Sequence, residues 1–117
     1  MRGTITPAQY RKLSRSKKGR TPESLVKAAI GDLCKLKGWL LVPVPAGVTS
    51  LPGSPDYYLH ARGRIIAVEV KRTTGGRLSD AQLAFQEECH RTGTPYLICT
   101  DVLKLEAYIE QKQIPQF

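Results

Sequence analysis

Long apolar runs are absent from this sequence, and no stretch approaches the ~20 residues that a membrane-spanning helix requires. The N-terminus also lacks the apolar core of a secretory signal, so we expect a cytoplasmic protein with no membrane partner. Cysteine is scarce: Cys34, Cys89 and Cys99 form no CxxC pair. Such a set is typical of reduced thiols and argues against a disulfide framework or a zinc site.

Acidic residues are absent from the first 20 positions, which carry seven basic residues, whereas residues 21–117 carry 11 basic and 10 acidic residues. The net charge of +8 therefore belongs almost entirely to a basic N-terminal arm, residues 1–20, ahead of one domain, residues 21–117. Such arms typically contact nucleic-acid phosphates; the alternative is a solubilising tail. The phosphate-contact candidates are Arg11, Lys12, Arg15, Lys17, Lys18 and Arg20.

Hydrophobic periodicity and turn residues predict the order α-β-β-β-α-β-α, an α/β fold in which helices flank a mixed central sheet. Thr21 is the expected cap of the first helix, with Pro22 as its first residue, and Ser79 is the expected cap of the second. A proline-rich loop spans residues 43–55. The expected helices are residues 22–37, 80–92 and 102–109, and the expected strands are residues 39–42, 56–60, 65–71 and 96–99, of which the first and last are expected to be buried.

The strand 65–71 ends in two opposite charges. Glu69 and Lys71 are two residues apart, so their side chains leave the same face of an otherwise apolar strand. Charges on such a strand are expected to pair with each other or to serve a site. A strand-end salt bridge and exposure at the sheet margin are the structural alternatives.

The position of Asp56 favours a functional site over these structural alternatives. This residue begins the neighbouring hairpin strand, so Asp56 and Glu69 are expected at the same end of adjacent strands. Two close carboxylates repel unless a cation neutralises them, and hard oxygen ligands favour Mg²⁺ or Mn²⁺. With Lys71 beside them, this set is suited to metal-assisted phosphodiester hydrolysis. The alternative for Asp56 is a turn or cap residue.

Two further polar residues are expected near this set. Gln82 shares the apolar arc of its helix, where an amide must find a partner, and the strand that carries Glu69 and Lys71 would supply one. Glu23 lies at the edge of the apolar arc of the first helix and could add a carboxylate. The alternative for Gln82 is a core amide whose hydrogen bonds are satisfied elsewhere, and the alternative for Glu23 is an acid that only stabilises the first turn of its helix.

These residues resemble the PD-(D/E)XK nucleases: Ser54-Pro55-Asp56 is followed by Glu69-Val70-Lys71. The glycine-flanked PD, the ExK strand and the early helical Gln82 are similar to the VRR-NUC branch. The resemblance spans about residues 21–100, within which Gly53 is the glycine beside the PD. It implies a restriction-endonuclease-like αβββαβ core.

The resemblance also implies roles. Asp56, Glu69 and the Val70 carbonyl would bind Mg²⁺ or Mn²⁺, with Glu23 as a further acid. Lys71 would position the attacking water, and Gln82 would support that water or a phosphate. Arg72 and Arg77, in the loop that follows, are further candidates for phosphate contact.

The expected protein is a metal-dependent endonuclease that acts as a homodimer on branched DNA such as Holliday junctions or flaps. Its expected location is the cytoplasm, on nucleoid DNA, and a phage-encoded protein is one option. The alternatives are a non-catalytic nucleic-acid-binding module and a restriction-type or RNA nuclease on the same fold.

Overall fold

The computed structural model describes residues 22–45, 47, 51–72 and 76–111, so the basic arm and all six of its predicted phosphate contacts lie outside the described residues. The described elements follow the predicted order, which confirms the α/β prediction. No helix in these ranges is long and apolar enough to cross a membrane. The elements are α2 (Glu23–Lys37), β1 (Leu40–Pro43), β2 (Tyr57–Ala61), β3 (Arg64–Val70), α3 (Asp80–Thr92), β4 (Tyr96–Cys99) and α4 (Val102–Gln111).

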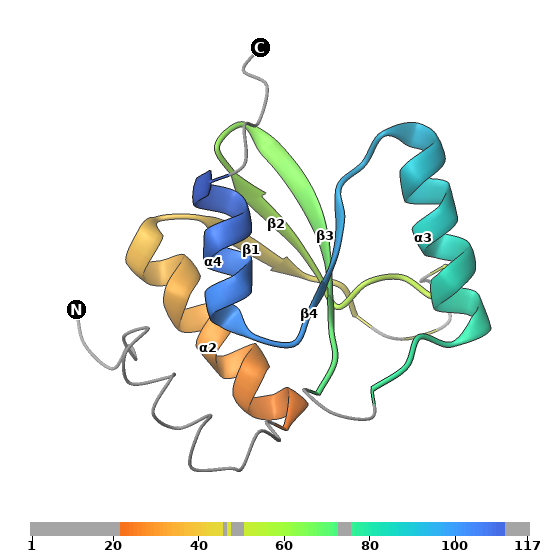
Figure 1. The fold of residues 1–117 in the computed structure, drawn as a ribbon, viewed down its shortest axis with the longest axis horizontal. Helices are drawn as coiled ribbons and strands as arrows, with labels where there is room; N and C mark the ends of the chain where they lie inside the picture. The colour runs from red at the N-terminus through yellow and green to blue at the C-terminus, as the bar shows by residue number, and fades with distance from the viewer. Residues whose placement is uncertain (1–21, 46, 48–50, 73–75, 112–117) are drawn as a thin grey trace.

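One sheet of order β1-β2-β3-β4 forms the centre of the molecule (Figure 1). The pairs β1–β2 and β2–β3 are antiparallel, whereas β3–β4 is parallel because α3 carries the chain back between them. A tight turn joins β2 to β3, and its residues Arg62 and Gly63 both have positive φ, 54° and 77°, as a two-residue hairpin requires. The mixed sheet is therefore as predicted.

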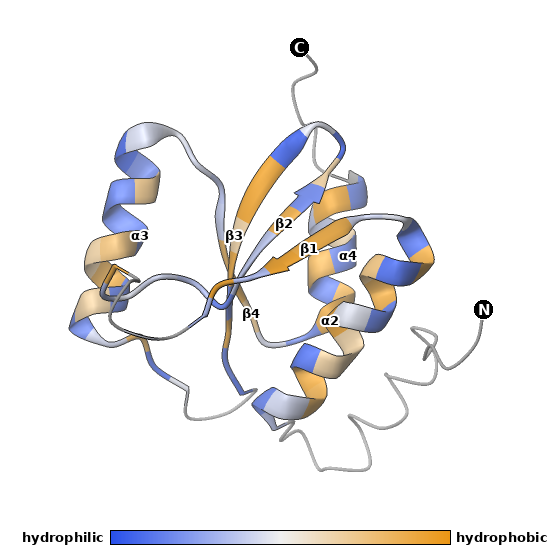
Figure 2. Ribbon diagram, turned by 180° about the vertical axis from the view of Figure 1, so that it is seen from behind, coloured by the Kyte–Doolittle hydropathy of each residue, from blue (hydrophilic) through white to orange (hydrophobic). Residues whose placement is uncertain are grey.

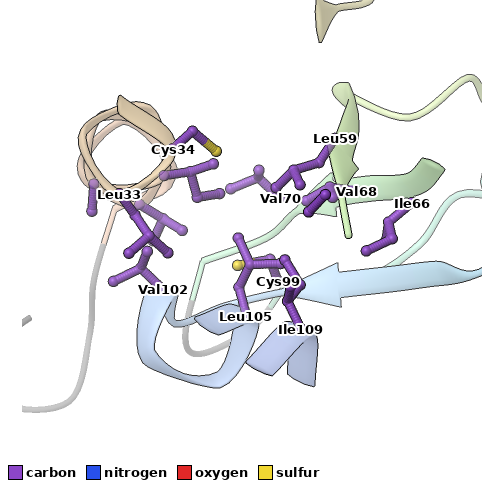
Figure 3. Close-up of a cluster of buried hydrophobic side chains, with 14 residues drawn as sticks. Leu33, Cys34, Leu59, Ile66, Val68, Val70, Cys99, Val102, Leu105 and Ile109 are labelled. Atoms are coloured by element: carbon purple, nitrogen blue, oxygen red, sulfur yellow. The ribbon is translucent and has the colours of Figure 1, made fainter. Parts of the chain in front are cut away.

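The hydrophobic core lies between one face of the sheet and the helices α2 and α4 (Figures 1 and 3). The alternate residues Ile66, Val68 and Val70 of β3 point into it, as the period-two pattern predicted. Leu59 of β2 is also fully buried there. This packing fixes the opposite face of β3 as the one that carries Glu69.

The opposite face of the sheet is only partly covered. The α3 helix contacts β4, but Leu40 of β1 is 58% exposed and Ile65 of β3 is 47% exposed. On this face, no helix of the described residues lies over the hydrophobic strand β1 (Figure 2), whose other face is contacted by α2. The prediction of a buried strand at residues 39–42 was therefore wrong: β1 is an edge strand with one uncovered face. The burial predicted for β4 holds for Cys99, whereas Ile98 is 40% exposed.

The helix ends follow the sequence signals with one difference. The structure places Pro22 at the N-cap of α2 without a side-chain cap, so Glu23 is the first helical residue and Pro22 is not. The predicted capping residue, Thr21, lies outside the described residues. Ser79 caps α3 as predicted, and Asp101 accepts a 2.8 Å hydrogen bond from Leu103 N at the start of α4.

Candidate active site

Asp56 lies immediately before β2, beside the end of β3. The residue after it, Tyr57, pairs with Val68, and the backbone carbonyl of Asp56 accepts a hydrogen bond from Val44 N. Its side-chain Oδ2 accepts a 2.8 Å hydrogen bond from Val70 N. Because both backbone and side chain are held, Asp56 is fixed next to Glu69 and Val70, as the short hairpin predicted.

Glu69 is a nearly buried carboxylate, only 3% exposed. Its Oε2 accepts a 2.7 Å hydrogen bond from Gln82 Nε2 and lies 3.5 Å from Lys71 Nζ. Its other oxygen, Oε1, is buried and makes no hydrogen bond with any described residue. One side of the carboxylate is thus held in place while the other keeps its lone pairs available.

Gln82 fixes Glu69 because its own amide is clamped. Gln82 Oε1 accepts from Ser79 N at 2.8 Å and Ser79 Oγ accepts from Gln82 N at 3.1 Å, a reciprocal capping box at the start of α3. The amide oxygen is held by the helix terminus, so the amide nitrogen points at Glu69. The prediction that Gln82 faces the strand of Glu69 is confirmed; its contact is the carboxylate, and a role toward water or phosphate stays a prediction.

Lys71 follows the last residue of β3, and its backbone N–H donates to Cys99 O at 3.0 Å. This bond continues the ladder with β4, so the start of the Lys71 side chain is anchored. The side chain is only 14% exposed and forms an ion pair with Glu69. The strand-end salt bridge weighed as a structural alternative is therefore present, within the same cluster as Asp56.

The acidic groups act on one another. Burial and then the charge of Asp56 raise the pKa of Glu69, Lys71 opposes them, and Glu23 on α2 raises that pKa further. The structure therefore brings Glu23 within electrostatic reach of Glu69, although the Glu23 side chain is exposed. Arg72 and Arg77 are exposed and frame residues 73–75, which lie outside the described part of the chain.

Tyr96 of β4 lies beside the same cluster. Its hydroxyl is buried without a hydrogen-bond partner among the described residues, and its ring lies 6.5 Å from that of Phe85 on α3. Burial, followed by the charge of Glu69, raises the pKa of Tyr96 to about 12. The hydroxyl therefore remains protonated at neutral pH, so it adds no further negative charge beside Glu69.

The side chains present suit a magnesium ion. Within the described residues, no three acidic, histidine or cysteine side chains form a preformed metal cluster. Mg²⁺ does not need one, since it is commonly bound through one or two carboxylates together with water and substrate phosphate. The free buried oxygen of Glu69 and its repulsion by Asp56 are what a divalent cation would satisfy.

Sequence reasoning missed Lys27, and it named Gly53 as part of the motif without its packing role. Lys27 Nζ on α2 lies 3.5 Å from Asp56 Oδ1. The spacing of four between Glu23 and Lys27 places both on one helix face and could have signalled it. Gly53 has φ +79°, and a Cβ there would lie 2.8 Å from Gln82 N and closer still to the Ala81 carbonyl. The loop before Asp56 therefore packs directly on the first turn of α3.

Comparison with solved structures finds a chain titled "VRR_NUC domain". The match has a TM-score of 0.65 and 23% sequence identity, and it covers 78% of this chain and 97% of that chain. No protein-family model matches the sequence, and no curated protein matches it. The chain thus has the mixed α/β fold of a VRR_NUC domain, which confirms the fold that the motifs implied.

Proposed function

We propose that the protein is a divalent-metal-dependent endonuclease that hydrolyses phosphodiester bonds in DNA. The observation that carries this proposal is the cluster at the ends of β2 and β3. There Val70 N holds Asp56, while Gln82 and Lys71 hold the nearly buried Glu69. The fold shared with a VRR_NUC domain supports the same assignment.

The proposed chemistry divides among these groups. Asp56, Glu69 and the Val70 carbonyl would hold Mg²⁺ or Mn²⁺, with Glu23 as an additional acid. When bound, such an ion lowers the pKa of water and neutralises charge on the phosphate. Lys71 would orient the attacking water and stabilise negative charge on the phosphate. Gln82 would keep Glu69 in one orientation through the capping box of α3.

Branched DNA such as flaps or four-way junctions is the proposed substrate, and the basic arm would contact a second segment of the duplex. A homodimer would place one active site on each of two DNA strands. The uncovered sheet face, where Leu40 and Ile65 are exposed on either side of His60, supports this assembly because large exposed apolar areas commonly mark interfaces. Light scattering tests the dimer.

A non-catalytic nucleic-acid-binding module is the second candidate. It would have no use for a nearly buried glutamate beside an aspartate, because like charges at that point repel both each other and a phosphate. The cluster therefore favours catalysis. A restriction-type or RNA nuclease would use the same cluster and differs only in substrate.

Cleavage of end-labelled duplex, flap and four-way-junction DNA, and of a matched RNA duplex, tests the proposal in Mg²⁺, Mn²⁺ or EDTA. We expect metal-dependent cutting with the branched DNA cut fastest. Binding without cutting in every metal would favour the module instead. Cutting of RNA alone would replace the DNA assignment.

A further inference from the structure

Asp56 uses its two carboxylate oxygens differently. Oδ2 accepts the 2.8 Å hydrogen bond from Val70 N, which ties it to the end of β3. Oδ1 faces α2, where Lys27 Nζ lies 3.5 Å away. The oxygen that an external cation would approach is therefore the one that a lysine of the same chain already contacts.

The two lysines of the cluster differ in how firmly they are held. The side chain of Lys71 is only 14% exposed, whereas that of Lys27 is 39% exposed. An exposed lysine–carboxylate pair contributes little stability, and the flexible four-carbon stem lets the ammonium move. Lys27 can therefore leave Asp56 at low cost, which Lys71 cannot do as readily for Glu69.

We infer that Lys27 is the counter-cation of Asp56 in the metal-free protein and competes with the divalent ion for that carboxylate. The inference rests on the proposed metal site and adds a control on its affinity. The helix position of Lys27, one turn after Glu23, leaves its ammonium at the rim of the site once displaced. There it becomes a cation for an oxygen of the substrate phosphate.

Competition of this kind couples the two binding events, so that metal binding favours substrate binding and substrate binding favours metal binding. An ion that displaces Lys27 frees a positive charge for the phosphate, and a phosphate that draws Lys27 away frees Asp56 for the ion. Lys27 is thus a positioning residue that favours assembly of the metal site when DNA is present.

Calorimetric titration of the DNA-free full-length protein with MgCl₂ tests the inference in wild type, Lys27→Met, Lys27→Arg and Lys35→Met. Lys35→Met is the matched control, because it removes the same charge from an exposed position of the same helix. We expect Lys27→Met to bind Mg²⁺ roughly three- to tenfold more tightly, from the loss of one repulsive charge and one exposed ion pair. Lys27→Arg and Lys35→Met should match wild type.

Equal or weaker Mg²⁺ binding by Lys27→Met, with wild type binding normally, would overturn the competition and leave the proposed nuclease intact. An equal gain in Lys35→Met would show a general charge effect and would also overturn it. Absence of Mg²⁺ binding by wild type would instead remove the metal site on which both proposals depend. Far-ultraviolet circular dichroism confirms that each variant is folded.

Discussion

Replacement of Glu69 by glutamine is predicted to stabilise the metal-free protein. Glu69 is 3% exposed, and burial and Asp56 raise its pKa above the usual 4.5, so its ionised form is disfavoured by folding. A rise of one unit in the pKa of a carboxyl group costs ~1.4 kcal/mol of folding free energy at neutral pH. Lys71 already opposes this shift, and the pKa of Glu69 is raised in spite of that ion pair. We therefore expect Glu69→Gln to be more stable than wild type, and a gain of about 1 kcal/mol would raise the Tm by roughly 4–8 °C.

The gain should depend on pH. The folded protein holds the Glu69 proton more tightly than the unfolded chain, whose pKa is near 4.5, so wild-type stability falls as pH rises from there through the folded pKa. At lower pH both proteins carry a neutral side chain and the difference should vanish. Urea melts in EDTA at acid and neutral pH measure it.

Magnesium should reverse the order of stability, so that wild type becomes more stable than Glu69→Gln. At a concentration tenfold above its Kd, Mg²⁺ would stabilise wild type by about 1.4 kcal/mol. Glu69→Gln lacks the ligand charge and should gain far less. A variant that is less stable than wild type in EDTA at neutral pH would refute the reasoning, because the Lys71 pair would then outweigh the cost of burial.

The remaining predictions concern other parts of the site. Gly53→Ala should lose roughly 2 kcal/mol in urea melts because its Cβ meets the backbone of α3, whereas Gly31→Ala, with open space and a helical position, should be neutral or stabilising; equal effects would contradict the close approach. Asp56→Asn should weaken Mg²⁺ binding by calorimetry, and unchanged affinity would remove Asp56 from the metal site. Deletion of residues 1–18 should weaken DNA binding and flatten its salt dependence, and an unchanged salt slope would exclude phosphate contacts by the arm.

Local patterns were enough to predict the parts of the site that lie on one element or one hairpin. The period-two alternation of β3 separates Glu69 from the core residues Val68 and Val70, and the short turn expected at residues 61–64 places Asp56 beside Glu69. The capping signal at Ser79 likewise predicts the start of α3 and so the position of Gln82 as its third residue. In these cases the deciding interactions are short in sequence.

Contacts between distant elements could not be predicted in the same way. Lys27 reaches Asp56 because α2 packs against the sheet, a tertiary contact that helical periodicity does not specify. Leu40 is exposed because β1 is an edge strand with one uncovered face. A run of four apolar residues predicts a strand but does not indicate whether that strand lies at the edge or in the centre of the sheet. Gly53 is similar, since its conformation is local but its contact with α3 is tertiary.

The central claim is that the Asp56–Glu69–Lys71 cluster hydrolyses DNA with a divalent ion. Single-turnover cleavage of a labelled four-way junction by wild type and Lys71→Ala, in Mg²⁺ and in EDTA, tests it most directly. We expect Mg²⁺-dependent cutting by wild type and a loss of at least about a hundredfold in Lys71→Ala, with DNA binding largely retained. Cleavage that persists in EDTA, or that survives undiminished in Lys71→Ala, would contradict the account.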